Sequence, residues 1–289
     1  MKKIRKRYLF LIILISFTVT IVSGIYIYKI NTCRYHANNN IYKNYTEDED
    51  KIYSKNINYR NAVNAYEKKI FALAIEELNE EINRFSGHAQ AYFLLGKIYE
   101  DVKFPEGKYY ARMIPQYEKY IELKPQGKRI GYVKLRVAQY YIQMGLKQKN
   151  VALLNKAEEY LLALDKTDST VMMALGAIYL DKENYDKAIA EFEKSANLPP
   201  AELKLKYNSL GLAYIKKGSY AKAQRFLEIA IKIDPKDKYA QNNLGFVYAQ
   251  QGNLKTAKVH FNEALMIDKN YKNAAENLNW VENEIRNKK

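Results

Sequence analysis

The 289-residue sequence has one cysteine, six prolines, twelve glycines and three histidines. The single cysteine, Cys33, excludes a disulfide within the chain. So few prolines and glycines argue against a fold built from short strands and tight turns, and they favour helices. The histidines, His36, His88 and His260, are scattered without a second ligand at metal-binding spacing, and we interpret each as a surface residue.

Motifs that carry chemistry are also missing from the sequence. It contains no phosphate-binding loop, no Gly-x-Ser-x-Gly and no Gly-rich dinucleotide turn. We therefore expect no catalytic residues, no metal and no cofactor, and we predict that the protein is not an enzyme.

Two 34-residue units, 204–237 and 238–271, repeat the same pattern near the C-terminus. The first has Leu210-Gly211 followed by Tyr214, and the second has the equivalent Leu, Gly and Tyr at 244, 245 and 248. Residues at this spacing share one face of a helix, so the glycine is expected where two helices cross. Gly218 and Gly252 follow at the turn into a second helix, where left-handed geometry favours glycine. A fixed period of this length is typical of a stacked helical repeat.

Both units resemble tetratricopeptide repeats. The second helix of that family carries Ala, a Leu or aromatic residue, and a second Ala, often with a closing Pro. Here these are Ala223, Leu227, Ala230 and Pro235, then Ala257, Phe261 and Ala264. The template also fits 169–202 well, and it fits 89–125 and 131–168 with insertions, at Pro105 to Gly107 and at Lys147 to Asn155. Residues 54–86 are interpreted as a degenerate repeat or capping hairpin, and 272–286 as a capping helix. The resemblance implies an all-α, right-handed α-solenoid over 53–289.

The N-terminus predicts a membrane segment. Tyr8 to Tyr28 runs for 21 residues without a charge, enough to cross a hydrocarbon core of about 30 Å. We assign 1–7 as a basic cytoplasmic end, 8–30 as a transmembrane signal-anchor and 31–52 as a polar tether. The positive-inside rule then places the repeats outside the cytoplasm. Cleavage near Ser23, giving a secreted protein, is the alternative. The residues before Cys33 do not resemble a lipoprotein signal, so its role is open.

Net charge gives little support to nucleic-acid binding. The formal charge is +15, and residues 1–40 supply seven basic side chains and no acid. The excess over the rest of the chain is modest and fits solvated helix faces. Anionic envelope polymers or lipids could still be attracted by it. The 27 tyrosines are interpreted as large packing residues with a polar tip rather than base-stacking platforms.

The resemblance implies a concave groove lined by first-helix residues. A mixture of amide and apolar side chains there suits an extended peptide, because amides pair with backbone groups while apolar residues bury side chains. For Asn242 and Asn243 the alternative is ordinary solvation on a helix surface. The candidate groove residues are Phe93, Lys97, Leu135, Arg136, Gln139, Met173, Asn208, Leu212, Asn242, Asn243, Phe246 and Gln250.

Two main hypotheses about function follow. The first is a membrane-anchored scaffold in the cell envelope that binds a protein or peptide partner in this groove. The alternative is a secreted or wall-associated factor whose basic surface binds anionic polymers or lipids. A regulatory subunit of a membrane enzyme is compatible with the same features. The sequence names neither the partner nor the oligomeric state.

Overall fold

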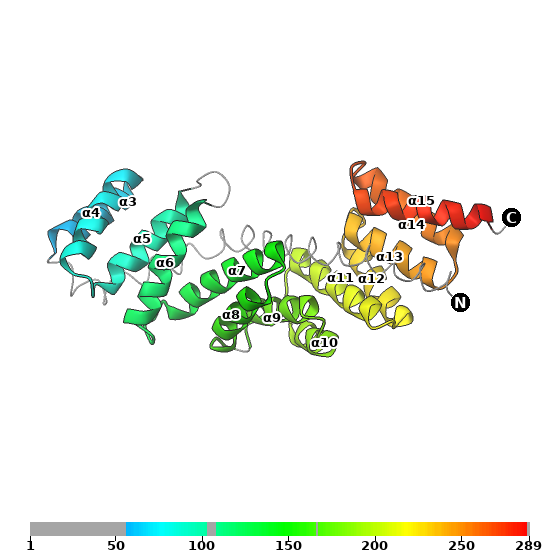
Figure 1. Ribbon diagram of the computed structural model, residues 1–289, viewed down its shortest axis with the longest axis horizontal. Helices are drawn as coiled ribbons and strands as arrows, with labels where there is room; N and C mark the ends of the chain where they lie inside the picture. Colours follow the sequence, from blue (N-terminus) through cyan, green and yellow to red (C-terminus); the bar gives the residue numbers. More distant parts are fainter. Residues whose placement is uncertain (1–55, 103–107, 166, 288–289) are drawn as a thin grey trace. The chain divides into compact units, whose positions relative to one another are not determined.

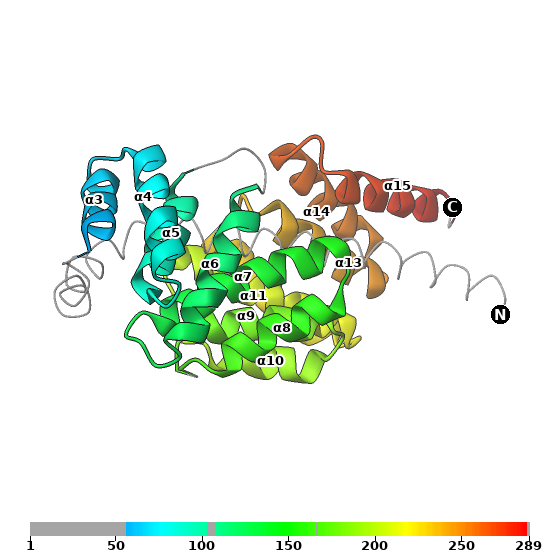
Figure 2. The same cartoon turned by 60° about the vertical axis from the view of Figure 1, so that its left-hand side comes forward.

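A computed structural model describes residues 56–102, 108–165 and 167–287, and every regular element in these ranges is an α-helix. The chain divides into two compact units. The described part of the N-terminal unit comprises 56–102, 108–144 and 155–164, and that of the C-terminal unit comprises 145–154, 165 and 167–287. Figures 1 and 2 show the helices from two directions. The predicted signal-anchor (8–30), the tether and the Pro105 insertion lie outside the described residues.

The N-terminal unit begins with the helix pair that the sequence suggested only weakly for 54–86. The first two helices form a hairpin that packs against the next helix. Its helices are α3 (Ile57–Glu67), α4 (Phe71–Arg84), α5 (Ala89–Asp101) and α6 (Lys108–Leu123), with most of α7 (Ile130–Gln148) and α8 (Val151–Leu162).

The predicted long loop between α7 and α8 is wrong. We expected an insertion between the helices around Lys147 to Asn155, but α7 runs to Gln148 and only two residues precede α8. The additional residues lengthen the helix instead. The apolar positions of α7 continue in helical spacing to Leu146, which is 2% exposed, so burial favours extending the helix over forming a loop.

The C-terminal unit contains three complete helix pairs and a last single helix. Successive helices along the chain pack against each other, and each first helix of a pair also contacts the first helix of the next pair. The last helix, α15, covers the residues for which a capping helix was predicted. The helices are α9 (Ser169–Asp181), α10 (Tyr185–Lys194), α11 (Pro200–Lys216), α12 (Tyr220–Ile233), α13 (Lys238–Gln250), α14 (Leu254–Ile267) and α15 (Lys272–Asn287).

One turn geometry joins the two helices of the pairs. Gly218 and Gly252 have φ of +72° and +81°, which confirms the predicted left-handed turn residue. The following N–H returns to a carbonyl five residues back, as in Ser219 N to Tyr214 O at 2.8 Å, the hydrogen bond of a Schellman motif. The same left-handed position is taken by Lys69, Lys149 and Glu183 in three other turns.

Tyrosines connect successive repeats. The hydroxyl of Tyr141 donates to Glu118 of the preceding repeat at 2.7 Å. The same kind of pair recurs in the C-terminal unit, from Tyr214 to Glu193 at 3.3 Å and from Tyr248 to Glu228 at 3.4 Å. The ring packs where helices meet while its polar tip finds an acid. At these three positions the tyrosines serve packing between repeats, as the sequence suggested.

Candidate functional site

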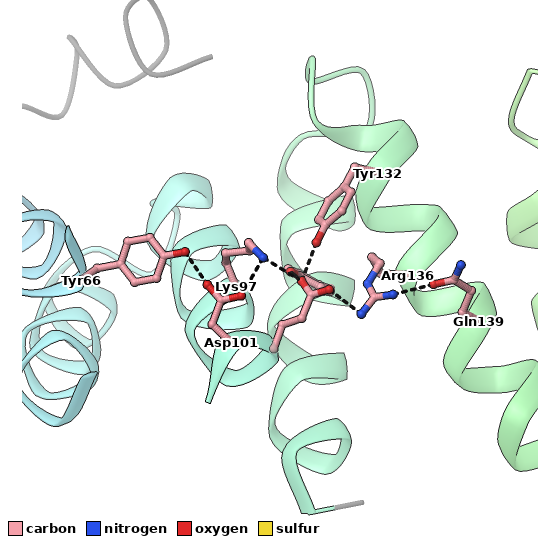
Figure 3. A network of polar contacts seen from close by, with 8 residues as sticks. Tyr66, Lys97, Asp101, Tyr132, Arg136 and Gln139 are labelled. Atoms are coloured by element: carbon pink, nitrogen blue, oxygen red, sulfur yellow. Dashed lines mark hydrogen bonds and ion pairs between the residues drawn. The ribbon is translucent and has the colours of Figure 1, made fainter. Parts of the chain in front are cut away.

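A buried ion network occupies the first-helix face of the N-terminal unit. At its centre Glu100, whose side chain is 3% exposed, forms an ion pair with Arg136 and lies 3.6 Å from Nζ of Lys97. The hydroxyls of Tyr117 and Tyr132 also donate to its carboxylate. Lys97 and Glu100 lie on α5, Tyr117 lies on α6, and Tyr132 and Arg136 lie on α7; Figure 3 labels Lys97, Tyr132 and Arg136 in this cluster. All the charged residues of this cluster therefore already have partners.

Helix spacing explains the assembly of this network. Lys97 stands three residues before Glu100 and four before Asp101, so the ammonium reaches both carboxylates, with 2.8 Å to Asp101. Tyr66 of α3 donates to the same aspartate, and Arg136 donates to Gln139 one turn further along α7 at 2.7 Å. With Tyr117 of α6, the network thus joins four helices, α3, α5, α6 and α7, by side chains that contact one another.

Electrostatics keep Glu100 ionised. Burial alone would raise the pKa of this carboxyl, but the positive charges of Arg136 and Lys97 and the two tyrosine hydroxyls hold it below its ordinary value. Burial and the neighbouring carboxylate raise the pKa of Tyr117 well above its usual value. The cluster therefore contains an ionised Glu100 and a neutral Tyr117 over the physiological range of pH.

Phe93 adjoins the network through aromatic contacts. Its ring centre lies 5.5 Å from that of Tyr120 and 6.3 Å from that of Tyr132. The guanidinium of Arg129 lies over the Phe93 ring, 4.6 Å from its centre, within the range of a cation–π contact. Phe93 is consequently 7% exposed and acts as packing for the ion network.

The first-helix face of the C-terminal unit has a different chemistry. Asn243 on α13 donates to Asn208 on α11 at 3.0 Å, and Asn277 on α15 donates to Asn242 on α13 at 2.9 Å. The surface-solvation interpretation of Asn242 and Asn243 is wrong, since these residues are 1% and 4% exposed. Each of these hydrogen bonds joins neighbouring first helices. It uses the amide nitrogen of one asparagine and the amide oxygen of the other.

A column of uncharged residues runs beside the amides. Ala177, Leu212 and Phe246 occupy the same repeat position on α9, α11 and α13, and Trp280 takes that position on α15, 34 residues after Phe246. Trp280 also lies three residues after Asn277, so both share one helix face. It is half-buried, whereas Phe246 is 8% exposed. We call these four residues, with Asn208, Asn242, Asn243, Gln250 and Asn277, the C-terminal face.

Trp280 was missed in the sequence analysis. The available signal was its spacing, because the only tryptophan of the sequence falls in register with Phe246. The helix that contains it was interpreted as a polar cap. Its exposed positions, such as Lys272, Glu276 and Asn279, do fit a cap. The tryptophan shows that another side of the same helix continues the C-terminal face.

The predicted groove residues separate into the two units. Phe93, Lys97, Arg136 and Gln139 join or adjoin the ion network, while Leu135 of the same unit is partly exposed. In the C-terminal unit Met173 accepts a hydrogen bond from Ser195 at 3.3 Å. Their role in binding a partner stays a prediction. Those that are buried are Phe93, Lys97, Gln139, Met173, Asn208, Leu212, Asn242, Asn243 and Phe246.

The structure corrects the interpretation of the described histidines. His88 is 1% exposed, its ring packs at a tilt against that of Tyr59, and its Nδ1 lies 2.7 Å from the buried Glu81. His260 is partly buried, stacks on Tyr248 and is 2.8 Å from Gln241. Both are packed against neighbouring helices, while His36 lies outside the described residues. In the described ranges no three acidic, histidine or cysteine side chains form a group suited to a metal, and no helix is long and apolar enough to span a bilayer.

The stacked hairpins define an all-α helical-repeat solenoid. Family models named TPR repeat and Tetratricopeptide repeat match residues 211–252, 239–271 and 169–202. The chain therefore contains tetratricopeptide repeats, as the residue pattern indicated. No curated protein sequence matches the chain.

Two solved structures show the same fold. A chain in the crystal structure of the APC/C hetero-tetramer Cut9-Hcn1 has a TM-score of 0.54 at 19% identity, covering 76% of this chain and 41% of that one. YrrB, a TPR protein with an unusual peptide-binding site, has a TM-score of 0.52 at 17% identity, covering 70% of this chain and 98% of that one. At these identities the likeness concerns the fold alone.

Proposed function

We propose that the protein is a membrane-anchored scaffold that binds an extended peptide or helix of a protein partner on its C-terminal face. The observation that carries this proposal is the combination of amides with an uncharged column that ends in the half-buried Trp280. Tryptophan is enriched among the residues that dominate binding energy at interfaces. The peptide-binding site of YrrB, a protein of the same fold, adds support by analogy.

The two first-helix faces differ in what they offer a partner. In the N-terminal unit, Lys97, Glu100 and Arg136 neutralise one another, so a charged ligand would have to break existing ion pairs. In the C-terminal unit each paired asparagine uses either its amide oxygen or its amide nitrogen. The remaining oxygen or nitrogen can form a hydrogen bond with a peptide backbone after a small movement of the neighbouring side chains. Binding on the C-terminal face should therefore depend weakly on salt.

Photo-crosslinking in lysed cells, with the salt concentration set before irradiation, tests the binding surface. A benzophenone amino acid is placed at Trp280 and, as a matched control, at Val259, an exposed residue of α14 in the same unit. We expect one protein to be captured from position 280 at both 0.1 and 0.5 M salt, and not from 259. Equal capture at both positions would contradict a partner on the C-terminal face. Capture that disappears at 0.5 M salt would favour the basic-surface alternative.

The anchor and its orientation are part of the same proposal. Their support is the uncharged run from Tyr8 to Tyr28 and the five basic residues before it. Protease added to spheroplasts should degrade the repeats while a cytoplasmic control protein survives. Repeats that remain intact until the membrane is broken would show that they lie inside, and repeats found in the medium would show cleavage of the segment.

A further inference from the structure

The turn between α3 and α4 exposes apolar and basic side chains together. Ile70 is 49% exposed and Leu73 is 41% exposed, and the two lysines that precede them, Lys68 and Lys69, are also exposed. We call these four residues the α3–α4 patch. Exposed apolar residues grouped in this way mark interaction sites more often than single ones do.

Neither lysine of the patch forms an ion pair within the residues that the structure describes. The corresponding turn of a later repeat is different, because Lys217 pairs there with Asp186. The acid nearest in sequence is Glu67 at the end of α3, so the turn has a net positive charge and suits an anionic surface.

Lys69 takes the left-handed position of the turn. Its φ is +59°, at the position where two later turns have Gly218 and Gly252 and two others have Lys149 and Glu183. A side chain in this conformation is strained where glycine is not. The strain does not distinguish Lys69 from the other turns, but it means that glycine can replace Lys69 and remove its charge without disturbing the turn.

We propose that the α3–α4 patch rests on the surface of an anionic lipid bilayer. Lysines bind lipid phosphates while short apolar side chains enter the headgroup region. Two lysines and two apolar residues hold a free protein only weakly. The inference rests here on the membrane anchor of the proposed function, because only residues 29–56 separate the uncharged run ending at Tyr28 from the first described helix. Tethering raises the local concentration of the patch at the membrane.

The test uses the full chain reconstituted in vesicles of phosphatidylcholine with or without phosphatidylglycerol. In a Cys33→Ser background, a fluorophore is attached to Ile70→Cys and, as control, to Phe85→Cys. Phe85 is 52% exposed in the same unit, just after the other end of α4. The basic residue beside it, Arg84, forms an ion pair with Glu80 at 3.8 Å, unlike the lysines beside Ile70. In vesicles that contain phosphatidylglycerol, we expect nitroxide lipids to quench the label at 70 several-fold more than the label at 85. This difference should be absent without phosphatidylglycerol and smaller at 0.5 M salt. Flotation of the chain with the vesicles tests the anchor separately. In chains that float, equal quenching at both sites would overturn the proposal.

Lys69→Gly separates a lipid contact from a structural role. Glycine relieves the left-handed strain, so the melting temperature should stay the same or rise by about 2 °C. Loss of one lysine should weaken association of the patch with the bilayer about fivefold. Unchanged quenching at position 70 in this variant would show that the charge has no part in the contact and would also overturn the proposal.

Discussion

Replacing Glu100 by alanine is expected to lower the free energy of unfolding of the N-terminal unit by about 4 kcal/mol. The carboxylate is 3% exposed and neutralises Arg136 and Lys97. Its removal takes a negatively charged partner from both of these largely buried cations. It also removes the acceptor of two tyrosine hydroxyls. An uncompensated buried charge costs far more than a lost surface contact.

Hydrogen exchange resolved along the sequence is the appropriate measurement, because repeat proteins need not unfold in one step. Exchange should accelerate in α5, α6 and the N-terminal unit's part of α7. The control is Glu122→Ala, which removes an exposed pair with Lys119 at 2.7 Å and should cost less than about 1 kcal/mol. Similar effects of the two substitutions would show that the buried network contributes no more than a surface pair.

The pH dependence gives the same residue a second signature. The pKa of Glu100 is lower in the folded protein than in the unfolded chain, so its contribution is complete above about pH 5. It is lost as the pH falls through the lowered folded pKa. Glu100→Ala should therefore be less sensitive to acid than the parent, and an unchanged acid transition would assign that transition to other carboxyls.

The sequence predicted the fold well because its repeat pattern is local. Leu210, Gly211 and Tyr214 define a helix face by spacing alone, and Gly218 defines the turn that follows. Both depend on residues a few positions apart, where helix geometry is fixed. The extra residues of α7 were misassigned because length alone does not tell whether inserted residues extend a helix or form a loop.

The site was harder to predict because its contacts join different repeats. Arg136 and Glu100 are 36 positions apart, and nothing in either local pattern shows that they pair. The same holds for Asn243 and Asn208. Both were predicted to face a ligand, and nothing in the sequence indicated that they also form a hydrogen bond with each other. Position on a helix gives the direction of a side chain, whereas burial depends on the neighbouring repeat.

Gly96→Ala is expected to destabilise the N-terminal unit by about 2 kcal/mol, although alanine is the better helix former. A methyl group at Gly96 would lie 2.5 Å from two ring carbons of Tyr117. That ring cannot move aside easily, because it is fully buried and its hydroxyl donates to Glu100 at 2.9 Å. The gain in helix propensity of about 1 kcal/mol is smaller than the cost of overpacking and of disturbing that hydrogen bond.

Gly131→Ala on α7 is the matched control. There a methyl group meets only Leu164, at 4.0 Å, so the substitution should be neutral or stabilise the helix by up to about 1 kcal/mol. Chemical denaturation monitored by helicity compares the two. Gly96 and Glu100 act on the same tyrosine. The loss of unfolding free energy in the double variant should therefore be smaller than the sum of the losses caused by Gly96→Ala and Glu100→Ala alone. Full additivity would mean that the methyl group is accommodated without moving Tyr117 away from Glu100.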